Sequence, residues 1–101
     1  MSINLEREIN KIYDNIINSD DYQASEQDQT KLKAYFLSEA DKLFSVPFQM
    51  SGSNLRYSYY FQGNLFADIN LLECPNFDDR DGFTSWFIKA FSESFDNLHK
   101  L

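Results

Sequence analysis

The sequence predicts an α+β domain in which two N-terminal helices precede a three-stranded antiparallel meander, and a C-terminal helix packs on one face of the sheet. Two observations support this fold. Apolar residues recur at helical spacing in three segments, and the stretch between the last two segments alternates with period two around a tight turn. Because the chain has 101 residues and no long linker, it is expected to form a single domain, residues 1–101.

The first helix is predicted over residues 3–18. Leu5, Ile9, Ile12 and Ile16 follow one another at the spacing of a single helix face. The short polar residues at positions 18–21 compete for backbone hydrogen bonds and therefore favour a turn that ends the helix.

A second helix is predicted to begin at Ser25, which is followed three residues later by Asp28 in a variant of the capping box. Pro47 cannot continue a helix, so this one is expected to end near residue 45. Its buried face is expected to contain Leu32, Phe36, Ala40, Leu43 and Phe44.

A short strand over residues 46–50 is predicted next. Pro47 cannot donate to a strand ladder, so this strand should begin there or lie at an edge of the sheet. The Ser- and Gly-containing residues 51–54 should form a flexible connection to the following hairpin.

Residues 55–72 are predicted to form a β-hairpin whose register follows from burial. A three-residue loop of Gln62, Gly63 and Asn64 brings the apolar residues of both strands onto one face. A two-residue loop of Gly63 and Asn64 would place them on opposite faces and is rejected. The preferred register pairs Phe61 with Leu65, Tyr59 with Ala67, Tyr57 with Ile69 and Leu55 with Leu71.

The opposite face of the hairpin is expected to be the outer surface of the sheet, because antiparallel sheets commonly bury one face and expose the other. After a polar connection, a third helix is predicted over residues 80–99. Its buried arc is expected to include Phe83, Phe87, Ala90, Phe91, Phe95 and Leu98, broadened by Trp86 and Ile88.

The chain is acidic, with sixteen Asp and Glu residues against nine Lys and Arg residues and a formal charge of −7. This charge repels nucleic-acid phosphates and anionic lipid headgroups, so we expect neither direct nucleic-acid binding nor membrane binding. A basic protein partner is expected instead. Cys74 is the only cysteine, and the N-terminal residues lack the pattern of a signal peptide, so a cytoplasmic location is expected.

No residue pattern predicts a catalytic, cofactor or metal site, and the protein is not expected to be an enzyme. His99 lies almost at the C-terminus, and nothing next to Cys74 in the sequence would activate its thiol. The acidic run at residues 78–82 resembles part of an EF-hand loop, but Phe77 and Ile88 occupy the positions of its first and last ligands. These acids are better explained as the cap of the third helix.

Aromatic side chains bordered by acidic residues suit docking on a cationic protein. The predicted function is therefore a small non-enzymatic inhibitor that covers the basic, nucleic-acid-facing surface of a nuclease-like protein. A toxin-immunity protein and a phage anti-defence protein, including the anti-CRISPR type, both fit this description. The candidate partner-binding residues are Arg56, Tyr60, Phe66, Asp68, Asp78, Asp79, Asp81, Asp20 and Asp21.

The alternative is a secretion or assembly chaperone that holds an extended client on an apolar sheet face. It predicts a homodimer with a large exposed apolar patch, whereas the inhibitor can be a monomer or a homodimer. The identity of the partner and the acidic patch that binds it are left open by the sequence.

Overall fold

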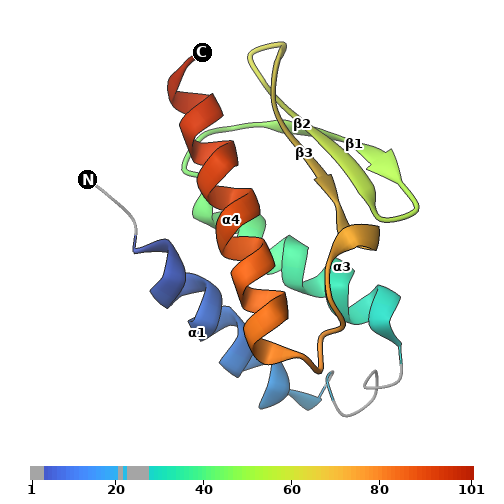
Figure 1. Cartoon of the computed structure of the whole chain (residues 1–101). Helices are drawn as coiled ribbons and strands as arrows, with labels where there is room; N and C mark the ends of the chain where they lie inside the picture. The colour runs from blue at the N-terminus through green and yellow to red at the C-terminus, as the bar shows by residue number, and fades with distance from the viewer. Residues whose placement is uncertain (1–3, 21, 23–27) are drawn as a thin grey trace.

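The structure is a computed structural model, and it describes residues 4–20, 22 and 28–101. The predicted α+β architecture is confirmed, and α4 packs against both α1 and the sheet (Figure 1). In chain order the elements are α1 (Leu5–Ile17), α3 (Gln29–Ala40), the 3₁₀ turn η1 (Asp41–Leu43), β1 (Gln49–Ser53), β2 (Arg56–Phe61), β3 (Asn64–Asn70), the 3₁₀ turn η2 (Leu71–Glu73) and α4 (Arg80–His99).

Each of the described helices α1, α3 and α4 begins with a side chain that caps its first turn. Asn4 accepts from the backbone N–H of Arg7, and Asp28 accepts from that of Lys31. The capping-box prediction placed Asp28 in the first turn of the helix, but Asp28 is the N-cap itself. Ser25, the predicted cap, lies outside the described residues. Asp79 caps α4 by accepting from the backbone N–H of Gly82.

The sheet has the strand order β1-β2-β3, and both pairings are antiparallel. β1 lies three residues further along the chain than predicted and contains most of the segment that was expected to be a flexible connection. A turn of Asn54 and Leu55, with φ of 55° and 67°, joins β1 to β2. Leu55 is therefore a turn residue and not the first residue of a strand.

The predicted register of the β2–β3 hairpin is correct in the half that is remote from the turn and wrong near the turn. Tyr57 pairs with Ile69 and Tyr59 with Ala67, as expected. Beyond them the register shifts by one residue, so that Tyr60 pairs with Leu65. The turn has two residues, Gln62 and Gly63, which both have positive φ, as tight hairpin turns of this kind require.

This shift is a β-bulge that places Phe66 as an extra residue on β3. The expectation that Phe66 lies on the outer surface is wrong, because its side chain is only 1% exposed and packs in the core against Phe44. Leu65, which was expected to be buried, is 48% exposed and lies beside Tyr60. The bulge interrupts the alternation, so Phe66 and Ala67 are buried in succession.

The core between the helices and the inner sheet face is dominated by aromatic rings. Phe44, directly after η1, contacts rings from the sheet and from α4, including Phe66 at 5.3 Å and Phe91 at 5.1 Å between centres. The fully buried aromatic side chains are Phe36, Tyr59, Phe66, Phe77, Phe83, Phe87 and Phe91.

Candidate functional site: acidic surfaces beside α4

The structure separates the predicted partner-binding residues into two groups. Asp78, Asp79 and Asp81 are exposed at the start of α4, which lies near the end of α1 (Figure 1). Arg56, Tyr60 and Asp68 lie instead on the sheet. At a rise of about 1.5 Å per residue, about 7.5 Å of helix separates Asp81 from Trp86 and about 24 Å separates it from Asn97, and both of these α4 residues share a pocket with Asp68. Asp20 is exposed just beyond the end of α1, and Asp21 lies outside the described residues.

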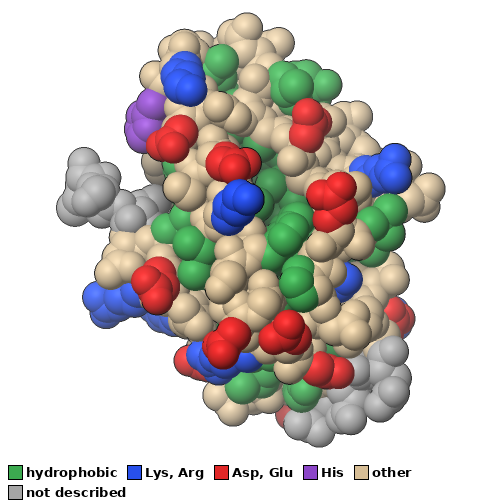
Figure 2. Space-filling model, viewed as in Figure 1, with side chains coloured by type: hydrophobic (Ala, Val, Ile, Leu, Met, Phe, Trp, Pro, Cys, Tyr) green, Lys and Arg blue, Asp and Glu red, His purple; other side chains and the backbone are tan. Residues whose placement is uncertain are grey.

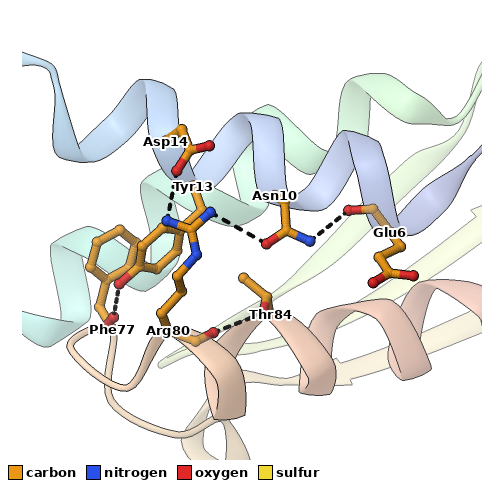
Figure 3. Close-up of polar contacts among 7 residues, drawn as sticks. All are labelled: Glu6, Asn10, Tyr13, Asp14, Phe77, Arg80 and Thr84. Carbon is orange, nitrogen blue, oxygen red and sulfur yellow. Dashed lines mark hydrogen bonds and ion pairs between the residues drawn. The ribbon is translucent and has the colours of Figure 1, made fainter.

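The first group forms what we call the acidic end, consisting of Asp78, Asp79 and Asp81 around Arg80. The Arg80 guanidinium reaches back to α1 and makes a 2.6 Å ion pair with Asp14. The same guanidinium lies 4.9 Å from the centre of the Tyr13 ring (Figure 3). Asp14 is thus partly neutralised, and the Asp79 carboxylate is engaged by the helix cap.

Tyr13 connects this end of the molecule to the chain that precedes α4. Its hydroxyl donates to the carbonyl oxygen of Phe77 at 2.6 Å, and burial raises the pKa of Tyr13 above its ordinary value. The backbone N–H of Phe77 donates in turn to the Gln29 side chain at 2.7 Å. These contacts of Tyr13 and Arg80, drawn in part in Figure 3, help to orient α4 against α1.

A groove of about 310 Å³ runs between β3 and residues 86–97 of α4, and we call it the α4–β3 groove. Three acidic residues line it, Asp68, Glu73 and Glu93, against one basic residue, Lys89. Figure 2 shows hydrophobic side chains along the middle of this face with acidic side chains around them. The groove is lined by Ala67, Asp68, Asn70, Glu73, Trp86, Lys89, Ala90, Glu93, Ser94 and Asn97.

The groove combines an apolar part with charged walls. Trp86 and Ala90 on α4 are half-buried and supply apolar surface. The Asp68 carboxylate accepts a hydrogen bond from the Ser58 hydroxyl at 2.7 Å, which fixes its orientation on β3. An aromatic anchor with acidic groups around it is an arrangement suited to a cationic protein surface.

Of the candidates named from the sequence, only Asp68 lines this groove. Trp86 was assigned to the buried arc of α4, and Glu73, Lys89 and Glu93 were not singled out. The available signal was the spacing of Trp86, Lys89, Ala90 and Glu93, which puts all four on one helix face. Two of these residues are apolar and two are charged, so the face fits neither a buried core nor a fully solvated surface.

Cys74 is buried, and burial raises the pKa of its thiol to about 12, so the thiol is protonated at neutral pH. Its backbone carbonyl accepts a hydrogen bond from the Lys33 ammonium at 2.8 Å. Within residues 4–20, 22 and 28–101, no cluster of three or more His, Cys, Asp or Glu side chains could hold a metal ion. Among the described helices, none has the length and apolar character needed to cross a membrane.

Comparison with known proteins assigns no family to the chain. No family model matches it, and no curated protein or solved structure matches it significantly.

Proposed function

We propose that the protein is a small inhibitor that binds the basic, nucleic-acid-facing surface of a nuclease-like protein through the α4–β3 groove. The main support is the set of three acidic residues that line this groove together with Trp86, on a chain with a net charge of −7. Surfaces that bind nucleic-acid phosphates are rich in Lys and Arg, so an acidic protein of complementary shape can cover them and exclude the nucleic acid. A toxin-immunity protein or a phage anti-defence protein of the anti-CRISPR type would act in this way.

The groove is a better candidate than the acidic end. At the acidic end Arg80 lies among the acids, and the Asp79 carboxylate already caps α4. Only Asp78 and Asp81 are left as exposed acids without such a contact. The groove also has two acids without such a contact, Glu73 and Glu93, because the Asp68 carboxylate is engaged by Ser58. It adds a half-buried tryptophan, a residue type enriched among the side chains that dominate binding energy at interfaces.

The chaperone hypothesis receives less support. It needs an apolar sheet face, whereas the strand register gives the outer face mostly small or polar residues. Tyr60 and Leu65 form one apolar pair near the hairpin turn. The other residues on this face include Gln49, Ser51, Ser53, Arg56, Ser58, Asp68 and Asn70.

Matched charge reversals test the proposal. Glu73→Lys with Glu93→Lys changes the groove, and Asp78→Lys with Asp81→Lys changes the acidic end; each pair changes the formal charge from −7 to −3, because two substitutions each add two charges. Asp79 is left intact because it caps α4.

Partners captured from the native host by the wild-type protein would be purified and assayed for nucleic-acid cleavage with each variant. We expect the wild-type protein and the acidic-end variant to bind and inhibit a cationic nuclease, and the groove variant to lose both effects. The proposal is wrong if no cationic partner binds, or if both variants inhibit as well as the wild-type protein.

A further inference from the structure

β3 is an edge strand, and its free edge borders the α4–β3 groove. The strand order β1-β2-β3 leaves one side of β3 without a neighbouring strand, and β3 is the strand that contacts α4 (Figure 1). Asp68 and Asn70, two residues apart on β3, both line the groove. The groove thus has a strand edge on one wall and a helix on the other.

The direction of the backbone groups on β3 follows from the hairpin ladder. The backbone N–H of Leu71 donates to the Leu55 carbonyl at 2.7 Å, so the backbone hydrogen-bonding groups of Leu71 face the β2 side. In an antiparallel ladder, hydrogen-bonded and non-hydrogen-bonded pairs of residues alternate. The backbone N–H and C=O groups of Ile69 therefore face β2, and those of Asp68 and Asn70 face away from it. The Asn70 carbonyl is the N-cap carbonyl of η2, where it accepts the first hydrogen bond of the 3₁₀ turn. Among the described residues, no loop, cap or side-chain hydrogen bond uses the Asp68 N–H, the Asp68 C=O or the Asn70 N–H.

We infer that the α4–β3 groove binds an extended basic segment of the partner, which pairs with β3 as a fourth strand. This inference rests on the proposed function, because it takes the occupant from the partner's basic surface. The Asp68 N–H, the Asp68 C=O and the Asn70 N–H would supply up to three main-chain hydrogen bonds, in the manner of other peptides that extend a sheet.

The groove fits such an occupant in charge and size. Glu73 and Glu93 complement Lys and Arg side chains on the added strand, while Trp86 and Ala90 offer surface to an apolar side chain between them. The groove volume, about 310 Å³, is at the low end of the range of about 300–1,000 Å³ for ligand pockets, so it accommodates a short stretch of chain. An added strand would lie about 4.8 Å from β3.

The other edge of the sheet lacks this complementarity. β1 has the sequence Gln-Met-Ser-Gly-Ser, with no acidic residue, and all five of its residues are exposed. None of the residues around the α4–β3 groove belongs to β1. A basic strand therefore has a charge-matched site only beside β3.

A synthetic peptide provides the test. The probe is an acetylated and amidated peptide of alternating Lys and Val, about eight residues long, which is within the usual strand length. One control is the same peptide with N-methylated backbone amides, which keeps the side chains and charge but cannot donate to β3. Binding to the ¹⁵N-labelled protein is followed by NMR titration and by exchange of individual backbone amides.

We expect shifts centred on β3 and α4, with slower exchange of the Asp68 and Asn70 amides in the complex. The N-methylated peptide should bind about tenfold more weakly, a loss of about 1.4 kcal/mol, because it cannot donate a hydrogen bond to the Asp68 carbonyl. The groove variant Glu73→Lys with Glu93→Lys should also lose binding, and the acidic-end variant Asp78→Lys with Asp81→Lys should keep it.

Equal binding of the N-methylated peptide, or unchanged exchange of the Asp68 and Asn70 amides at saturation, would overturn strand addition. Shifts confined to the acidic end would overturn it as well. The proposed function fails by a different result, namely the absence of a cationic nuclease that the protein binds and inhibits.

Discussion

The Tyr13 hydroxyl donates a 2.6 Å hydrogen bond to the Phe77 carbonyl oxygen, and the two rings stack with their centres 4.5 Å apart. This pair joins α1 to the segment between β3 and α4, far apart in the sequence. The Lys33 ammonium holds the same segment from α3 through the Cys74 carbonyl. Since α4 forms one wall of the groove, these contacts help to fix the geometry of the binding surface.

Removing the Tyr13 hydroxyl tests the importance of this link. Tyr13→Phe retains the ring stacking but leaves the buried Phe77 carbonyl without this donor. We expect the free energy of unfolding to fall by about 1–2 kcal/mol, as measured by urea denaturation. Tyr60→Phe, on the outer sheet face, is the control and should change stability by much less. Equal effects of the two substitutions would show that the hydrogen bond to Phe77 contributes nothing measurable.

Asp79 is predicted to stabilise the protein through the cap of α4. Its carboxylate accepts from the Gly82 N–H at 3.1 Å, whereas the neighbouring Asp78 is exposed and caps no helix. Asp79→Ala should lower the free energy of unfolding by about 1 kcal/mol, the usual cost of losing an N-cap, and Asp78→Ala should change it little. Thermal denaturation of the two variants measures the difference, and a larger loss for Asp78→Ala would contradict the assignment of the cap.

Asp41 is predicted to destabilise the folded protein at neutral pH. Burial raises the pKa of its carboxyl to about 6, from an ordinary value of 3.8, against the opposing effect of the hydrogen bond from the Tyr59 hydroxyl at 2.7 Å. The folded state therefore holds this proton more tightly than the unfolded state. The resulting stabilisation is complete below about pH 4 and is lost as the pH rises through about 6.

Asp41→Asn should remove this pH dependence. The asparagine carbonyl can still accept from Tyr59, and a negative charge disappears from the C-terminal end of α3, where the helix dipole disfavours it. A shift of about two units corresponds to at most about 3 kcal/mol, and partial exposure reduces this to about 1–2 kcal/mol. We expect Asp41→Asn to be more stable than wild type at pH 7, while Glu6→Gln, which removes an exposed acid from the first turn of α1, is not. A less stable Asp41→Asn at pH 7 would refute this account.

The burial of Cys74 predicts a slow thiol reaction in the folded state. Because burial raises the thiol pKa to about 12, the reactive thiolate is scarce at pH 8. Iodoacetamide should modify the native protein slowly and the urea-unfolded protein at the rate of a free cysteine. A native rate equal to the unfolded rate would contradict the burial of this residue.

Helical periodicity in the sequence was enough to locate α1 and α4 closely, because their apolar faces pack directly on the core. Strand parity was sufficient for the pairs of Tyr57 with Ile69 and of Tyr59 with Ala67. It failed at Phe66 because strict alternation assumes an uninterrupted ladder, and a bulge adds a residue without a marker such as proline. The positive φ of Gln62, a residue not typical of such turns, concealed the two-residue loop.

The groove could not be predicted because it depends on how α4 lies against the edge of β3. Trp86 belongs to an apolar arc in the sequence, and only tertiary packing leaves it half-buried beside Glu93 and Glu73. The charge of the chain indicated a cationic partner, but it could not distinguish the groove from the acidic end. Only about 7.5 Å of helix, from Asp81 to Trp86, lies between the acidic end and the start of the groove, so position along the sequence could not separate the two surfaces either.

The central claim is that the groove is the binding surface, and Trp86 reports on it directly. Trp86 is the only tryptophan in the chain, so the intrinsic tryptophan fluorescence of the protein comes from one wall of the groove. Acrylamide quenching of this fluorescence would be measured with and without a tryptophan-free form of the cationic partner or with the Lys-Val peptide. We predict strong protection of Trp86 in the wild-type protein and in Asp78→Lys with Asp81→Lys, but not in Glu73→Lys with Glu93→Lys. Saturated binding that leaves Trp86 quenching unchanged would contradict the claim.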